Sequence, residues 1–196
     1  MWEFFAAIVS ALVAFAGLLF AWRNAREAAL RKGEVLAWSN DVIGNLQSLV
    51  LICQQRSALP QPIEAEKLRD IYFATSVLAE QGRLFFKNER AGNHGVEKQE
   101  AFRGLRADIL DQVILAHQIA GRFERADEDS RLRMACVAED AERRFVTLAQ
   151  KEVGRVRTAS VDTSKGGYGA QLNWLMDRLD QKRLDSLRRQ FATRQA

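Results

Sequence analysis

The stretch MWEFFAAIVSALVAFAGLLFAWRNAREAALRK, residues 1–32, decides the fold class of this chain. From Phe4 to Trp22 it has no charged residue, and Ser10 is its only polar one. These 19 residues would form a helix about 28 Å long at 1.5 Å per residue. That length matches the roughly 30 Å hydrocarbon core of a bilayer. The stretch therefore predicts a transmembrane helix.

The residues that flank this apolar stretch predict its orientation. Trp2 and Trp22 stand at its two ends, where tryptophan is enriched at membrane interfaces. The ten residues that follow carry the single acid Glu27 and four cations: Arg23, Arg26, Arg31 and Lys32. Positive residues mark the cytoplasmic side. We therefore expect a single-pass protein of the cell (inner) membrane, with the N-terminus outside, the domain after Trp22 in the cytoplasm, and Trp2, Trp22, Arg23 and Arg26 at the lipid interface.

Two other interpretations of the apolar stretch have less support. A secretory signal has a basic N-terminal region, whereas this one has Glu3 and no Lys or Arg, although Ala14-Phe15-Ala16 resembles a cleavage site. A buried core helix needs a large protein around it, and the rest of the chain amounts to about one domain. We therefore expect the stretch to be retained as an anchor.

Small residues recur along one side of the predicted span, at alternating steps of three and four residues. They are Ala7, Ser10, Ala14, Gly17 and Ala21. Such stripes let helix backbones approach closely in lipid, where van der Waals contact drives association. Small residues are also common in membrane helices for other reasons. We predict that this stripe is a seam for self-association, with membrane lipids as the surrounding partner.

After Trp22 about 170 residues remain, which is enough for one compact domain. Its Ala-, Leu-, Glu-, Arg- and Gln-rich segments favour helix, and its only prolines are Pro60 and Pro62. The sequence predicts an all-α protein in which the transmembrane helix continues into a cytoplasmic bundle of about five helices. We divide it into an anchor at 1–22, a stalk and first bundle helix at 23–59, and the remaining helical domain at 60–196.

The expected helices follow from apolar periodicity and from helix-breaking residues. The first runs on to Pro60 with an apolar face at helical spacing: Val35, Trp38, Val42, Leu46, Leu49 and Cys53. It can bend at Gly33 and Gly44. A second helix starts at Pro62 and carries Leu68, Ile71, Tyr72, Leu78 and Phe85. Loops are expected at 88–104 and 155–169, a third helix up to Phe123, a fourth from the N-cap Asp127 to Gly154, and a fifth from about Ala170 through Phe191.

Charge and cysteine content narrow the class of partner. The two cysteines, Cys53 and Cys136, lie in apolar helical stretches and are expected to be buried thiols in a reducing compartment. The net charge of +4 is modest. No nucleic-acid recognition motif accompanies the basic residues, so nucleic acid is not an expected partner.

One loop has the composition of an anion-binding site. Arg155, Arg157 and Lys165 flank a Thr/Ser-rich turn and Gly166-Gly167, directly before an expected helix N-terminus. Exposed N–H groups and cations at such a place can hold a phosphate or carboxylate. The loop lacks the Walker order of residues and a preceding strand. A polar connector is the alternative interpretation.

Other candidate chemistry finds little support. His117 is expected at the boundary of the third helix with a hydrogen-bonded partner, and His94 lies in a loop. KNERAGNH, residues 87–94, resembles the R-x4-6-H signature of the all-helical HEPN ribonucleases, but Lys87 occupies the arginine position, and an ammonium does not replace a planar guanidinium. Acid pairs such as Asp108/Asp111 are interpreted as solvated helix faces. We assign no catalytic residue, metal site or cofactor.

These observations predict a membrane-anchored helical interaction or scaffold protein. We expect it to form a homo-oligomer or to be a subunit of a membrane assembly. Two alternatives stay open: a pore-forming or membrane-perturbing effector, and a nucleotide- or phosphate-binding helical domain or enzyme that uses the 155–169 loop.

Overall fold

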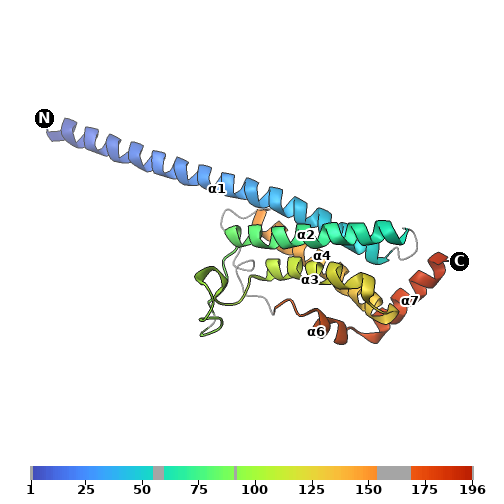
Figure 1. The fold of residues 1–196 in the computed structure, drawn as a ribbon. Helices are drawn as coiled ribbons and strands as arrows, with labels where there is room; N and C mark the ends of the chain where they lie inside the picture. The colour runs from blue at the N-terminus through green and yellow to red at the C-terminus, as the bar shows by residue number, and fades with distance from the viewer. Residues whose placement is uncertain (1, 55–59, 91, 154–168, 196) are drawn as a thin grey trace.

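The first helix, α1 (Trp2–Gln54), is a single unbroken helix of 53 residues. It passes through Gly33 and Gly44, where a bend had been considered from the sequence. A Cβ added at either glycine would have no neighbouring atom within 4 Å, so both positions are open to solvent. An exposed glycine costs a helix only about 1 kcal/mol relative to alanine, so the flanking turns carry the helix through both positions (Figure 1).

The structure, a computed structural model, describes residues 2–54, 60–90, 92–153 and 169–195, with side chains described from Ala14 to Arg189 within these ranges. In this part of the chain it has six α-helices and two short 3-10 helices, and the only extended pairing is one isolated bridge. The predicted all-α class is therefore confirmed.

Four helices form the bundle (Figure 1). They are the C-terminal half of α1, α2 (Gln61–Phe85), α3 (Asp108–Arg122) and α4 (Glu128–Val153). α1 contacts α2 and α4, and α3 contacts the same two helices, so the four close into a ring around one core. Consecutive helices run in opposite directions, which is the up-down arrangement that short connections favour.

The predicted apolar face of α1 forms one side of this core. All six of its residues are buried: Val35, Trp38, Val42, Leu46, Leu49 and Cys53. Trp38 is central, because its ring packs against Phe85, Phe86 and Phe145 with centroid distances of 5.5 to 6.1 Å. Its Nε1 donates to the Leu78 carbonyl at 2.9 Å. A buried indole N–H needs such a partner.

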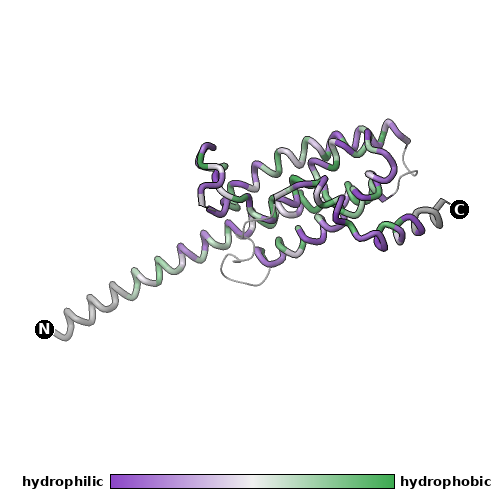
Figure 2. Tube along the Cα trace, turned by 90° about the horizontal axis from the view of Figure 1, so that it is seen from below, coloured by the Kyte–Doolittle hydropathy of each residue, from purple (hydrophilic) through white to green (hydrophobic). Residues whose placement is uncertain are grey.

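The other half of α1 projects from the bundle. Every residue from Ala14 to Glu34 is exposed, including Phe15 at 62% and Phe20 at 69%. Figure 2 shows apolar residues along the outer coloured part of this projecting segment and hydrophilic ones nearer the bundle. Near its base, Arg31 contacts the ends of α2 and α4. Within the described residues, α1 is the one helix long and apolar enough to cross a membrane, by length and composition.

Two helices replace the single fifth helix that the sequence predicted. α6 (Leu172–Asp177) ends before Asp180, and α7 (Gln181–Gln195) begins after it. Asp180 starts the new helix, since its Oδ1 accepts from the Lys182 N–H at 3.1 Å and its carbonyl accepts from Arg183 at 3.0 Å. Asp at such a position satisfies N–H groups that a continuous helix would have bonded internally.

α7 is attached to α4 by an apolar cluster and by ion pairs of two arginines, of which Arg188 pairs with Asp129. Leu184 packs in a small cluster with Leu132 and Cys136. Beside it, Arg183 contacts Asp140 at 2.6 Å and Glu139 at 3.3 Å. These acids hold the pKa of Arg183 above its ordinary value, chiefly through the Asp140 hydrogen bonds.

Local predictions elsewhere are largely confirmed. Asp127 caps α4, because its Oδ1 accepts from the Ser130 N–H at 2.9 Å. The thiols of Cys53 and Cys136 are buried. Tyr72, which the sequence analysis grouped with the apolar residues of the second helix, is not part of the core, since it is 37% exposed. Its ring stacks on His117 at the bundle surface, with centroids 4.1 Å apart.

Candidate functional site

One end of the bundle faces the same way as the projecting half of α1. Arg31 Nη2 donates to the carbonyl of Phe85, the last residue of α2, at 3.2 Å. It also contacts Glu152, next to the end of α4, at 3.3 Å. Arg31 is nine residues beyond Trp22, about 14 Å along the helix. We call the bundle end at this level, made of Arg31, residues 83–108 and residues 151–153, the anchor-side end.

The connection between α2 and α3 is a folded loop at this end. Glu89 and Leu105 pair through two backbone hydrogen bonds of 2.8 Å. Gly104, next to this bridge, donates its N–H to the His94 carbonyl at 3.0 Å. Gly104 has a φ of +84°, and a Cβ there would lie 2.2 Å from the Glu89 carbonyl oxygen. Only glycine fits such a position, so Gly104 allows the two ends of the loop to pair.

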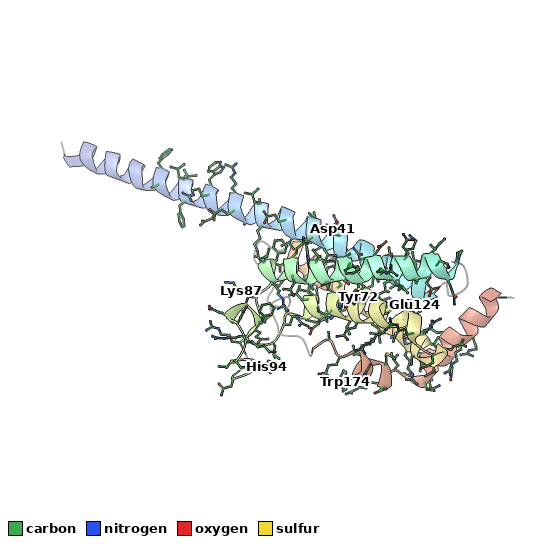
Figure 3. All side chains as sticks on the ribbon, viewed as in Figure 1. Asp41, Tyr72, Lys87, His94, Glu124 and Trp174 are labelled. Carbon is green, nitrogen blue, oxygen red and sulfur yellow. The ribbon has the colours of Figure 1, made fainter. Side chains whose placement is uncertain are left out.

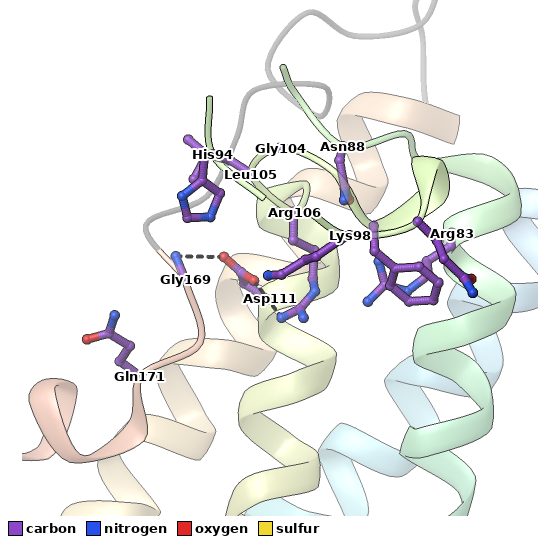
Figure 4. A pocket seen from close by; sticks show the side chains of 12 residues that line it. Arg83, Asn88, His94, Lys98, Gly104, Leu105, Arg106, Asp111, Gly169 and Gln171 are labelled. Carbon is purple, nitrogen blue, oxygen red and sulfur yellow. Dashed lines mark hydrogen bonds and ion pairs between the residues drawn. The ribbon is translucent and has the colours of Figure 1, made fainter. Parts of the chain in front are cut away.

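A cavity of about 680 Å³ opens between this loop, the start of α3 and the segment before α6 (Figure 4). We call it the anchor-side cavity. Its charged and polar lining comes from three parts of the chain: Arg83, Asn88, His94, Lys98, Arg106 and Asp111, with Gly169 and Gln171 on the third side. The loop thus brings basic side chains to one concave surface.

Asp111 ties the three parts together. Arg106 Nη1 lies 3.3 Å from Asp111 Oδ1, and the Gly169 N–H donates to Asp111 Oδ2 at 3.0 Å. The Asp111 side chain is only 4% exposed. Burial raises its pKa, against the opposing effects of Arg106 and of the Gly169 hydrogen bond. The sequence-based interpretation of Asp111 as part of a solvated helix face was therefore wrong.

Gln118 fixes the segment that carries Gly169. Its Nε2 donates to the Ala170 carbonyl at 2.9 Å, and its Oε1 accepts from the Leu172 N–H at 3.3 Å. Because the side chain amide has both a donor and an acceptor, it binds this segment as a backbone strand would. The third wall of the cavity is thereby held on α3.

Two polar atoms of the residues that line the cavity lack a hydrogen-bond partner. Arg106 Nε and Asn88 Oδ1 are buried and have no hydrogen-bond partner within the described residues. Arg83 is engaged, since its Nε lies 3.1 Å from Glu80 and its guanidinium lies over the Phe102 ring at 4.5 Å. Buried polar groups without partners are uncommon in proteins.

Charge is unevenly divided between the two ends of the bundle. Residues 83–106 contain three acids and six cations: Arg83, Lys87, Arg90, Lys98, Arg103 and Arg106. Residues 124–129, between α3 and α4, contain four acids and one arginine. Figure 3 shows Lys87 and His94 at the anchor-side end and Glu124 toward the opposite end. The positive end is the one from which α1 projects.

The predicted membrane-interface and packing residues lie along α1. Trp22, Arg23 and Arg26 are exposed on its projecting half, as are Ala14, Gly17 and Ala21. The Arg26 guanidinium lies over the Trp22 ring at 5.5 Å. The side chains of Trp2, Ala7 and Ser10 are outside the described residues.

The predicted anion-binding loop cannot be compared with the cavity residue by residue. Arg155, Arg157, Lys165, Gly166 and Gly167 all lie outside the described residues. The basic loop that the structure does describe, at 83–106, was predicted only as a connection. The density of cations in this loop was a sequence signal for an anion-binding site. Nothing in the sequence indicated that Asp111 and Gly169 form another wall of the same cavity.

The prediction for His117 is confirmed. Its Nδ1 lies 3.0 Å from the Tyr72 carbonyl oxygen, which can only accept, so Nδ1 carries the proton. Across the described part of the chain, no group of three or more His, Cys, Asp or Glu side chains is arranged to hold a metal ion.

The fold and the site define a class: a helical bundle on a long apolar N-terminal helix, with a basic cavity at the end nearest that helix. Comparisons of the chain with protein-family models, with curated proteins and with solved structures found no match.

Proposed function

We propose that this chain is a single-pass membrane protein whose helical domain lies at the cytoplasmic face and acts by binding other proteins, as a homo-oligomer or as a subunit of a membrane assembly. One observation carries the proposal. α1 is a single helix whose C-terminal half is core and whose projecting half exposes apolar side chains.

The exposed half of α1 needs an apolar environment. Phe15, Leu18 and Phe20 are each between 62% and 70% exposed. Burying such a side chain stabilises it by about 1.5 to 3 kcal/mol, and soluble monomers rarely expose large contiguous apolar patches. A bilayer covers the whole circumference of the helix, which fits apolar residues that lie on all of its sides.

The cations after Trp22 support the proposed orientation. Arg23 and Arg26 follow the apolar stretch directly, and the anchor-side end of the bundle adds further positive charge. Anionic lipids of the cytoplasmic leaflet attract such residues by about 1 kcal/mol each near the surface. The same charges oppose translocation of the domain.

The unbroken α1 would make the tether stiff. No loop separates the projecting half from the core half, so the direction of the span sets the direction of the bundle. Confinement to a thin layer beside the bilayer raises the effective concentration for partners in the same membrane. Association of spans through the small-residue stripe would then orient neighbouring domains.

The outer face of α2 offers a surface for contact with another protein. Phe73, Val77 and Leu84 share one side of the helix and are 62%, 57% and 82% exposed. Exposed apolar side chains that gather on one face are typical of interaction surfaces. This supports an interaction role for the domain beyond the anchor itself.

Fractionation and topology mapping test the anchoring. We expect the full-length protein to resist carbonate extraction from membranes, and a reporter fused after Ala196 to be active only in the cytoplasm. Deleting residues 1–22 should release the domain to the supernatant. A full-length protein that stays in the supernatant after ultracentrifugation would falsify the proposal.

Crosslinking in membranes tests the self-association. Gly17→Leu fills the small-residue stripe, whereas Ala16→Leu adds the same side chain outside the stripe and is the matched control. We expect dimers or higher species with the wild type and the control, and a loss of about tenfold with Gly17→Leu. Monomer alone in the wild type, without any copurifying partner, contradicts the interaction role.

A further inference from the structure

The anchor-side cavity has the chemistry of a binding site. We propose that it binds a phosphate ester, the chemical group presented by a glycerophosphate lipid headgroup or by a free glycerol phosphate. The lipid source rests on the proposed membrane anchoring, whereas binding of the free ester does not.

Positive charge in the cavity exceeds negative charge. Arg83, Lys98 and Arg106 line it, and the single acid on its wall is Asp111. Asp111 is already bound by Arg106 and by the Gly169 N–H. Lys98 forms no ion pair with any described residue. The cavity therefore offers cations to an anion, and phosphate forms strong charge-assisted hydrogen bonds with both arginine and lysine.

The size and position of the cavity suit such a ligand. Its volume of about 680 Å³ lies within the range of about 300 to 1,000 Å³ typical of small-molecule sites. The cavity is at the bundle end where Arg31 contacts Phe85 and Glu152. Membrane helices tilt by about 20° on average, and a tilt toward this side of α1 brings the cavity closer to the headgroups.

The basic surface continues beyond the cavity itself. A second hollow of about 700 Å³ lies on the other side of the loop, lined by Lys87, Arg90 and Arg103, and it shares His94 with the first. The negative 124–129 segment lies at the far end of the bundle. The charge of this loop thus favours anions at the anchor-side end.

Two binding measurements on the full-length protein separate the sources of the ester. In neutral detergent, sn-glycerol 3-phosphate is titrated by calorimetry, with uncharged glycerol as a ligand that lacks the phosphate. In nanodiscs, the thermal midpoint is compared between phosphatidylcholine alone and phosphatidylcholine mixed with phosphatidylglycerol. We expect glycerol phosphate to bind and glycerol not to bind, and a higher midpoint with phosphatidylglycerol, because a ligand bound only by the folded state stabilises it.

Variants assign the response to the cavity. Lys98→Gln should weaken binding about tenfold, and Lys98→Arg should restore most of it. The matched control is Lys67→Gln, which removes one charge from an exposed position near the far end of α2 and should change neither measurement.

The outcomes discriminate between the possible explanations. A Lys98-dependent response to glycerol phosphate without a response to phosphatidylglycerol supports the site and assigns it a soluble ligand. Equal losses in Lys67→Gln and Lys98→Gln, or no response in either measurement, overturn the proposal. If fractionation places the chain in the supernatant while glycerol phosphate still binds through Lys98, the anchoring fails and the cavity assignment stands.

Discussion

Arg31, on the projecting half of α1, pairs with Glu152 near the end of α4 at a distance of 3.3 Å. The Glu152 side chain is 5% exposed, whereas that of Arg31 is 47% exposed. Arg31 also donates to the Phe85 carbonyl. This residue therefore fastens the base of the projecting helix to the ends of two other helices.

Arg31→Ala should loosen this junction. It removes a charge-assisted contact to a buried carboxylate, so we expect a loss of about 1 to 2 kcal/mol in the free energy of unfolding, measured by chemical denaturation in detergent. The control is Arg143→Ala, whose side chain is 68% exposed and whose partner Glu139 lies one turn away. Such surface pairs contribute about 0.5 kcal/mol or less. Equal losses for the two variants would contradict a special role for Arg31.

Two glycine-to-alanine changes should have opposite effects. A Cβ at Gly82 would lie 2.4 Å from Leu110 Cδ2 and 2.7 Å from Trp38 Cζ2. Overpacking costs about 1 to 3 kcal/mol, so Gly82→Ala should be destabilising. Gly44 has nothing within 4 Å of its Cβ position, so Gly44→Ala should stabilise the helix by up to about 1 kcal/mol. Thermal unfolding of both variants checks the contrast.

The buried Asp111 should give stability an unusual pH dependence. Its pKa is raised above the ordinary value of 3.8, mainly by burial. The folded state therefore binds this proton more tightly than the unfolded state, and Asp111 lowers stability as the pH rises from about 3.8 through the raised pKa. Asp111→Asn should remove that loss. Unfolding curves of both proteins over a pH series measure it.

Asp127 provides a control of opposite sign for that experiment. Hydrogen bonds from Ser130 lower its pKa below 3.8. Asp127 therefore stabilises the protein above pH 3.8, and this contribution is lost as the pH falls through the lowered pKa. If Asp111→Asn and Asp127→Asn change the pH profile in the same direction, the burial argument for Asp111 is wrong.

Arg183 should determine whether α7 stays on the bundle. Its guanidinium contacts Asp140, Glu139 and the Cys136 carbonyl. Arg183→Ala removes these bonds, at a cost of about 2 kcal/mol, so the amides of α7 should exchange hydrogen roughly 30 times faster. The neighbouring Lys182→Ala, which lacks such contacts in the described structure, should leave the exchange unchanged. Mass spectrometry of residues 181–189 measures both.

Local features of the chain were predictable from sequence. The apolar face of α1 from Val35 to Cys53 follows from helical spacing alone, and all of it is buried. The cap at Asp127 was predictable because an Asp side chain bonds N–H groups within its own turn. The apolar stretch ending at Trp22 likewise identified the helix that projects. Each of these features depends on residues within a few turns of one another.

The anchor-side cavity could not be predicted in the same way. Arg106 and Asp111 are close in sequence, but Gly169 joins them from 58 residues away. Nothing near Asp111 in the sequence distinguishes it from a solvated acid. Burial came from the packing of the 86–107 loop and the segment before α6 against α3.

The all-α class, the apolar N-terminal helix and the core side of each long helix were predictable from residue order, because apolar periodicity is a property of neighbouring residues. Three features became visible only in the folded chain: α1 passes straight through its glycines, Asp180 divides the last helix, and cations of one loop meet Asp111 and Gly169. These features depend on which distant segments pack together, and local spacing carries no information about that pairing.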